Sequence, residues 1–254
     1  MSTQRAKAEL FRSLHVPGSP IVLFNVWDAG SAKAVAAAGA RAIATGSWSV
    51  AAASGFADGE RIPLDLALDN LARIVGAVEL PVTLDLESGY GETAAGVGLT
   101  VTRAIEAGAI GCNLEDSFPE DGSLRETTDQ VARLAAAREA AEAAGVPFFI
   151  NARTDHFLIN PPEKHEALVA AALDRGRAFR DAGADGFFVP GLVDEALIAR
   201  VVAGSPLPVN VMVGSGSPPL ARLAELGVAR VSHGPGPFRG AMKWLEEAAR
   251  VAMG

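Results

Sequence analysis

The chain has 254 residues, 49% of them hydrophobic, and a formal net charge of -8 at pH 7. This length suits one large core, and no linker or charge block divides the sequence, so we expect one domain over residues 1–254. The acidic balance argues against a nucleic-acid partner, and no apolar run approaches the roughly 20 residues that span a membrane. The charged helical pattern of residues 1–14 has no apolar stretch of signal length, so we predict a cytoplasmic protein.

Short apolar runs alternate with alanine-rich helical stretches along the chain. Apolar runs of this length are typical of strands that are buried on both faces of a parallel sheet. The single cysteine, Cys112, lies in one such run, so we expect it in the core and predict neither a disulfide nor a thiolate metal cluster. The predicted strands are 21–26, 40–45, 82–86, 110–114, 148–151, 186–189, 209–213 and 229–232. The predicted helices are 32–38, 64–77, 94–107, 128–144, 163–182, 194–203, 219–226 and, as the eighth, 239–253.

Eight strand-then-helix units in a chain of this length predict a closed (β/α)8 TIM barrel, because an open doubly wound sheet usually has fewer strands. Several predicted helices end in an alanine–glycine or leucine–glycine step, which is a common helix stop. The second strand is expected to be followed by a long loop that runs to residue 60. Barrels of this kind carry their functional residues at the carboxyl ends of the strands, so the candidate site lies there.

The third predicted strand ends in two acids, Asp85 and Glu87, and a Gly-Tyr-Gly turn follows at once. Two unpaired carboxylates this close repel each other, and a divalent cation with oxygen ligands would relieve that repulsion. The next two strands end in Glu115 and Arg153, and the planar fork of arginine suits a carboxylate or a phosphate. The pattern favours a cation site beside an anion-binding arginine over the alternative, a ring of salt bridges at the barrel mouth.

Five segments at the predicted strand ends together resemble the phosphoenolpyruvate mutase/isocitrate lyase superfamily. They are residues 46–49, Asp58, residues 85–91, residues 114–116 and residues 151–153. Their order and spacing fit that family from about residue 23 to residue 190. The resemblance implies that Mg²⁺, or Mn²⁺ in its place, binds at Asp85. It also implies that Asp58, Glu87 and Glu115 act on the metal directly or through water, and that the metal holds a small 2-oxocarboxylate.

The same resemblance assigns roles around the substrate. Ser47 and the neighbouring backbone amides would receive the substrate carboxylate, and Arg153 would stabilise an enolate or the departing group. The predicted catalytic residues are Arg153, Glu115 and Ser123, and the predicted substrate-binding residues are Thr45, Gly46, Ser47, Trp48, Tyr90, Arg153, Asn210 and His233.

Three of the candidates come from their positions on the predicted strands and not from the resemblance. His233 closes the last strand and His156 follows Arg153, so either could act as an acid or base, and Asn210 could point its amide into the site. The alternative for each is a structural role, as a side chain satisfied by neighbouring backbone or rim groups.

The loop after the fourth strand departs from the family. Relatives that cleave isocitrate or methylisocitrate carry a cysteine, lysines and a histidine in this loop, and residues 117–124 contain none of these. The lysine and asparagine that contact the phosphoryl group in the mutase are absent from the loop as well. We therefore expect a Mg²⁺-dependent carbon–carbon lyase or decarboxylase that acts on a small 2-oxo- or 2-hydroxycarboxylate through a pyruvate enolate. The alternatives are a carbon–phosphorus enzyme, either a phosphonomutase or a phosphonopyruvate hydrolase, and a non-catalytic barrel that binds a metabolite.

The last predicted helix bears on assembly. Residues 239–253 place apolar side chains at helical spacing, and relatives often exchange their eighth helix between paired subunits. We therefore expect a homodimer, or a homotetramer built from such dimers, in which this helix contacts the partner. The apolar set is Met242, Leu245, Ala249 and Ala252.

Overall fold

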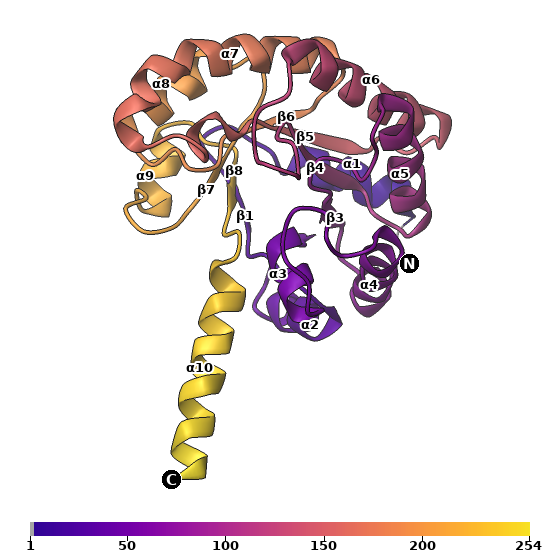
Figure 1. Cartoon of the computed structure of the whole chain (residues 1–254), viewed down its shortest axis with the longest axis vertical. Helices are drawn as coiled ribbons and strands as arrows, with labels where there is room; N and C mark the ends of the chain where they lie inside the picture. The colour runs from indigo at the N-terminus through magenta and orange to yellow at the C-terminus, as the bar shows by residue number, and fades with distance from the viewer. Residues whose placement is uncertain (1–2) are drawn as a thin grey trace.

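The computed structural model describes residues 3–254, and in this range eight parallel strands form one barrel-shaped sheet (Figure 1). Hydrogen-bonded neighbours follow the order β1-β8-β7-β6-β5-β4-β3-β2. Val26 joins the two ends of this order, because its N donates to Ala44 O at 2.9 Å and its O accepts from Gly46 N at 3.1 Å. The predicted (β/α)8 barrel is therefore confirmed. The strands are β1 Ile21–Leu23, β2 Ile43–Ala44, β3 Val82–Asp85, β4 Gly111–Glu115, β5 Phe149–Arg153, β6 Gly186–Phe188, β7 Val209–Met212 and β8 Arg230–Ser232.

Helices follow the strands, and the glycines at the predicted stops take up left-handed conformations, for example Gly108 with φ 98° and Gly183 with φ 94°. The expectation of a long loop after the second strand was wrong in its first part, because α3 fills it. The α-helices are α1 Gln4–Ser13, α2 Ala29–Ala37, α3 Ser47–Ala53, α4 Leu64–Ala77, α5 Ala94–Glu106, α6 Thr127–Ala143, α7 His165–Asp181, α8 Glu195–Gly204, α9 Leu220–Glu225 and α10 Gly236–Met253. Two short 3-10 helices, η1 Asp155–Phe157 and η2 Pro162–Lys164, precede α7.

The α1 helix covers the amino-terminal end of the barrel. Phe11 and Leu14 pack there in a buried cluster with Phe149, which begins β5. The ring of His15 stacks on Phe149 with centroids 4.0 Å apart and an interplanar angle of 20°. Because this end is filled by side chains, the opposite end, where the strands terminate, is the one left for a site.

The α10 helix projects away from the barrel, with the carboxyl terminus at its far tip (Figure 1). Its first turn is anchored by aromatic contacts, since the ring of Phe238 lies 5.1 Å from Trp27 and 5.9 Å from Trp48. None of its residues is buried, and its side chain Trp244 is 68% exposed. Within the described range, no helix combines the length and the apolar character needed to cross a bilayer.

Candidate active site

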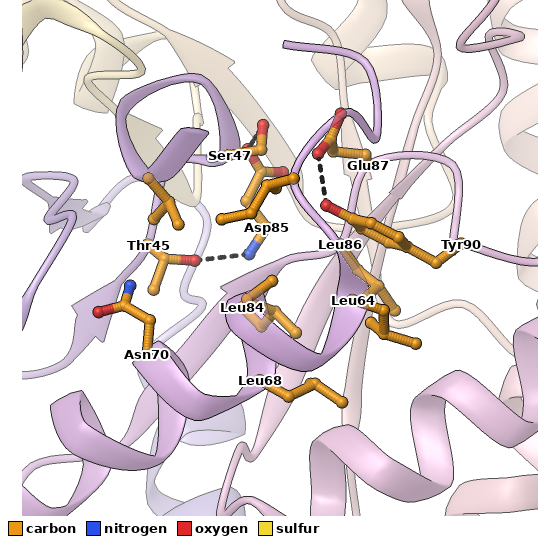
Figure 2. Close-up of a pocket in the computed structure, with 13 residues that line it drawn as sticks. Thr45, Ser47, Leu64, Leu68, Asn70, Leu84, Asp85, Leu86, Glu87 and Tyr90 are labelled. Atoms are coloured by element: carbon orange, nitrogen blue, oxygen red, sulfur yellow. Dashed lines mark hydrogen bonds between the residues drawn. The ribbon is translucent and has the colours of Figure 1, made fainter. Parts of the chain in front are cut away.

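A cavity of about 180 Å³ opens at the carboxyl ends of the strands. It is smaller than the roughly 300–1,000 Å³ of drug-sized ligand pockets, so it suits a small metabolite. A second cavity, of about 20 Å³, has Asp85 and Glu87 in its lining (Figure 2) and is too small for an organic substrate. The larger cavity is lined by Asn25, Gly46, Ser47, Trp48, Asp58, Asp85, Asn113, Arg153, Leu158, Phe188, Met212, Ser232, Gly234 and Pro235.

Asp85, the last residue of β3, is held by donors from the two neighbouring strand ends. Its Oδ2 accepts from Ser47 N at 2.9 Å and from Ser47 Oγ at 2.8 Å. Its Oδ1 accepts from Asn113 Nδ2 at 3.0 Å, and its backbone N donates to Thr45 Oγ1 at 2.9 Å (Figure 2). Thr45 and Ser47, which were predicted to bind substrate, therefore orient the predicted metal ligand.

Glu87 ties the end of β3 to the loop before α4. Its Oε2 accepts from Gly59 N at 2.9 Å and from Glu60 N at 2.7 Å, and its Oε1 accepts from the Tyr90 hydroxyl at 3.0 Å (Figure 2). Burial raises the pKa of Glu87 to about 7. Both carboxylate oxygens of Glu87 accept hydrogen bonds from the protein. The bond from Gly59 N holds the neighbouring residue Asp58 at the cavity.

The turn after Glu87 is held in an unusual backbone conformation. Glu87 has φ 52° and Tyr90 has φ 54°, values that favour glycine. The buried guanidinium of Arg133 donates from Nη2 to Ser88 O at 2.7 Å and to Gly91 O at 2.9 Å, one carbonyl on each side of Tyr90. Arg133 therefore fixes the turn that carries Glu87 and Tyr90.

Asp58 and Asp85 face the same cavity. Burial raises the pKa of Asp58, and the negative charge of Asp85 raises it further. The described residues include no group of three or more histidines, cysteines and acids that could hold a metal by themselves. Mg²⁺ is commonly held by one or two carboxylates, with waters and substrate completing its shell, so this pair of hard oxygen donors fits that ion.

Arg153, the last residue of β5, lies between two acids. Its Nη1 lies 2.6 Å from Glu115 Oε2, while Nε and Nη2 lie 2.5 and 3.0 Å from the two carboxylate oxygens of Asp155. Burial acts to lower the pKa of Arg153, but the charges of Glu115 and Asp155 outweigh it and raise the pKa above its ordinary value. The guanidinium is therefore permanently charged and presented to the cavity.

Comparison with known proteins identifies the family to which the chain belongs. The family model described as phosphoenolpyruvate phosphomutase matches residues 11–253. The chain belongs to the phosphoenolpyruvate mutase/isocitrate lyase superfamily.

Three members of this superfamily illustrate its range. A Burkholderia cenocepacia J2315 crystal structure, provisionally called a phosphonomutase, has 57% identity and a TM-score of 0.96, covering 98% of this chain and 100% of its own. An oxaloacetate decarboxylase from Pseudomonas savastanoi pv. phaseolicola is 31% identical, covering 94% of this chain and 82% of that protein. A 2-methylisocitrate lyase from Salmonella typhimurium is 30% identical, covering 87% of this chain and 78% of that protein. The relatives of this chain in the superfamily include lyases and mutases, which supports the prediction that the chain is an enzyme.

One further structure is more distant in sequence. A phosphonopyruvate hydrolase whose crystal structure contains oxalate and Mg²⁺ shares the fold, with a TM-score of 0.85 and 24% identity, covering 97% of this chain and 87% of its own. At this identity the likeness shows the fold alone.

Some residues predicted from the sequence lie away from the cavity lining. Ser123 Oγ donates to Asp121 Oδ1 at 2.7 Å, within the loop after β4. Asn210, inside the barrel, donates from Nδ2 to Ser232 Oγ at 3.1 Å, and the ring of His233 packs against Phe24 with centroids 5.0 Å apart. Glu115 contacts Arg153, and Tyr90 contacts Glu87. Gly46 and Trp48 line the cavity itself. The catalytic role of Ser123 and the substrate contacts of Asn210 and His233 stay predictions.

Other residues of the site were not predicted from the sequence. Asn25 accepts at Oδ1 from the backbone N of His233 and of Gly234, both at 2.9 Å, which joins β1 to the turn before α10. Asn25 and Asn113 are each a polar residue that interrupts an apolar run, a signal that could have identified them. Phe188 and Met212 carry no such signal, because an apolar residue at a strand end reads as core.

Proposed function

We propose that this protein is a Mg²⁺-dependent carbon–carbon lyase that decarboxylates an oxaloacetate-like 2-oxodicarboxylate. The observation that carries the proposal is the lining of one small cavity by two acids, Asp58 and Asp85, and one arginine, Arg153. A metal and an arginine that line one small cavity suit a substrate with two carboxylates separated by a short carbon chain. The oxaloacetate decarboxylases in the superfamily support this choice.

Asp85 and Asp58 would hold Mg²⁺, which supplies a Lewis acid for the oxygens of the 2-oxo group and its carboxylate. Arg153 would bind the other carboxylate, which is the group that leaves as CO₂. Ser47 and Asn113 keep the carboxylate of Asp85 in one orientation, so little reorganisation is needed when charge moves to the oxo group. No lysine, histidine or cysteine is among the described lining residues, so solvent would supply the final proton.

Cleavage of isocitrate or methylisocitrate requires more catalytic groups than decarboxylation does. It needs a base for the hydroxyl proton and an acid for the carbanion that departs, and such groups typically contribute about 10²–10⁴-fold. In the loop after β4, Asp121 is fully exposed, and hydrogen bonds from Ser123 lower its pKa. A carboxyl that acts as an acid at neutral pH needs a raised pKa, so Asp121 is not a replacement for the missing cysteine.

The test is a product-release screen with purified protein, with and without Mg²⁺. The panel contains oxaloacetate, a 2-alkylmalate, methylisocitrate and phosphonopyruvate, and pyruvate is the product to be measured. We expect Mg²⁺-dependent turnover of oxaloacetate and negligible cleavage of methylisocitrate. Robust methylisocitrate cleavage would contradict our interpretation of the loop, and a blank panel would favour a non-catalytic, metabolite-binding barrel.

Carbon–phosphorus chemistry is the second candidate function. It is favoured by the 57% identity to the Burkholderia protein that is provisionally called a phosphonomutase. Phosphonopyruvate in the same panel separates the two candidates. Release of phosphate and pyruvate from it would indicate a hydrolase, and formation of phosphoenolpyruvate would indicate a mutase.

We also propose that the chain assembles through α10 into a homodimer, or a tetramer of such dimers. The helix carries a row of exposed apolar side chains, among them Trp244, Leu245 and Val251. An open apolar groove lies beside β1 and α2, with Phe24 and Val35 in its lining. A helix that extends into solvent and a groove that lacks a covering helix complement each other in a second copy of the chain.

A further inference from the structure

Arg230, the first residue of β8, is a buried cation inside the barrel. Among the described residues its hydrogen-bond partners are neutral side chains, Asn113 Oδ1 at 3.0 Å and Ser232 Oγ at 3.4 Å, and both partners line the cavity. Its Nη1 has no partner among those residues, and burial lowers the pKa of Arg230 to about 9. A buried charge without a contacting counter-charge costs stability, so its presence points to a role in the site above it.

A chain of hydrogen bonds leads from Arg230 to Asp85. Arg230 Nη2 donates to Asn113 Oδ1 at 3.0 Å, and Asn113 Nδ2 donates to Asp85 Oδ1 at 3.0 Å. Because β8 and β4 are not neighbours in the sheet, the first of these bonds crosses the barrel interior. A guanidinium only donates and an ionised carboxylate only accepts. The oxygen of the Asn113 amide therefore faces Arg230, and its nitrogen faces Asp85.

The remaining contact of the Asn113 amide does not fix this polarity by itself. Asn151 Nδ2 donates to the same oxygen of Asn113 at 2.9 Å, and Asn151 Oδ1 has no partner among the described residues. If both amides turned over, the two side chains would keep a bond between them with donor and acceptor exchanged. Asp85 opposes that change while it carries its full charge, but a bound cation withdraws this charge. Arg230 opposes it in both states.

The oxygen of Asp85 that Asn113 contacts is also the one left for a cation. Oδ2 accepts two hydrogen bonds from Ser47, whereas Oδ1 accepts one from Asn113. Each carboxylate oxygen has about two lone-pair directions, so Oδ1 keeps one free. The bond from Asn113 sets the direction of that free lone pair. This direction matters for Mg²⁺, which demands near-ideal octahedral geometry.

We propose that Arg230 is a positioning residue for the metal site, acting through the amide of Asn113 on Oδ1 of Asp85. The proposal rests on the Mg²⁺-dependent function proposed above. The hydrogen-bond chain favours cation binding, because it keeps the free lone pair of Oδ1 in one direction. The charge of Arg230 acts in the opposite sense, since like charges repel, so the experiment has to separate the two effects.

The first test is a double-mutant cycle in Mg²⁺ affinity, measured by isothermal titration calorimetry. Arg230→Met removes the charge and the donors but keeps a linear side chain, and Asn113→Leu removes the amide but keeps its shape. The charge of Arg230 acts in both backgrounds, whereas the hydrogen-bond chain exists only with Asn113, so the cycle isolates the chain. Arg230→Met should weaken Mg²⁺ binding about 3- to 10-fold more when Asn113 is present, the usual effect of one net hydrogen bond.

Two outcomes of the cycle separate this inference from the function on which it rests. Equal effects of Arg230→Met in the two backgrounds would overturn the inference and leave the proposed function intact. Absence of Mg²⁺ binding by the wild-type protein would instead overturn the proposed function. Gln130→Met is the control, because Gln130 is another buried amide beside β4, with Nε2 3.5 Å from Leu114 O, and lies outside the hydrogen-bond chain. It should keep the wild-type affinity.

The second test asks whether Arg230 serves stability instead. Metal-free Arg230→Met should melt at the wild-type temperature or above it, because an unpaired buried charge is removed and Asn151 still bonds Asn113. A lower melting temperature with unchanged Mg²⁺ affinity would show a purely structural role and overturn the inference. Arg230→Lys keeps the charge and only donates, which covers the case in which Arg230→Met does not fold. Its Mg²⁺ affinity should stay within about 3-fold of wild type, and a loss above about 10-fold in the folded variant would also overturn the inference.

Discussion

Ser47 donates two hydrogen bonds to the same oxygen of Asp85, from its backbone N at 2.9 Å and from its hydroxyl at 2.8 Å to Oδ2. Ser47 begins α3 and Asp85 ends β3, so the contact joins two neighbouring strand-end segments at the cavity. An oxygen that accepts two bonds in fixed directions leaves the carboxylate little freedom. Asp85 is therefore preset in the orientation in which it would hold a cation.

The first prediction is that Asp85→Ala abolishes Mg²⁺ binding in isothermal titration calorimetry. The protein should still fold, because the lost bonds from Ser47 and Asn113 are partly offset by relief of the repulsion with Asp58. We expect a change in melting temperature of no more than about 4 °C, which corresponds to about 1 kcal/mol for a chain of this size. Asp181→Ala, at an exposed acid on α7, is the control. Unchanged Mg²⁺ affinity in Asp85→Ala would contradict the assignment.

The second prediction concerns Arg153→Lys. Lysine keeps the positive charge, but it cannot engage Glu115, Asp155 and a substrate carboxylate at once, as the arginine fork can. The kcat/KM for oxaloacetate should fall by about 10–10²-fold, because a charge-assisted hydrogen bond to a substrate carboxylate is worth about 1.5–3 kcal/mol. Mg²⁺ affinity should change little. Arg200→Lys, at an exposed ion pair, should leave both quantities unchanged. Near wild-type kinetics in Arg153→Lys would show that the arginine does not contact the substrate.

The third prediction concerns the pH dependence of stability. Burial of His15, aided by the charge of Arg230, lowers its pKa to about 3. The unfolded chain, with a histidine pKa near 6.5, then binds a proton that the folded protein does not bind between about pH 6.5 and pH 3. This histidine should therefore cost stability as the pH falls through that window, by up to about 1.4 kcal/mol per pH unit.

His15→Phe should remove this part of the pH dependence, because phenylalanine can still stack on Phe149 and does not titrate. Urea unfolding of both proteins between pH 4 and pH 8 gives the comparison. Above about pH 7 the two slopes should agree, since His15 is then neutral in both states. Identical slopes between about pH 4 and pH 6 would show that His15 is not buried in its neutral form.

The fourth prediction concerns assembly. Light scattering at micromolar concentration should give a homodimer or a homotetramer. Replacing Trp244 and Leu245 by glutamate should give a monomer with unchanged helical circular dichroism, because a charged α10 cannot occupy an apolar groove. Lys243→Glu changes the charge of the same helix at a 76% exposed position and should keep the assembly. A monomeric wild-type protein would refute the proposal.

The sequence by itself determined the barrel and the main charged residues of the site. Strands buried on both faces must be apolar throughout, so they are easily recognised, and eight of them alternating with helices leave few other folds. Asp85, Glu87 and Arg153 were recognisable for the complementary reason, since a charged residue that interrupts an apolar run stands out. The helix α3 was missed, because seven residues between glycines give too short a pattern.

Only the tertiary structure shows which groups each charged side chain contacts. The oxygens of Glu87 are bonded to Gly59, Glu60 and Tyr90, and Glu115 pairs with Arg153, contacts that depend on how loops meet across the barrel. Apolar lining residues such as Met212 could not be recognised from the sequence either, because a strand end that faces a cavity and one that faces the core have the same composition. Sequence spacing fixes which residues reach the rim of a barrel, but the distances between strands and loops fix which of them meet.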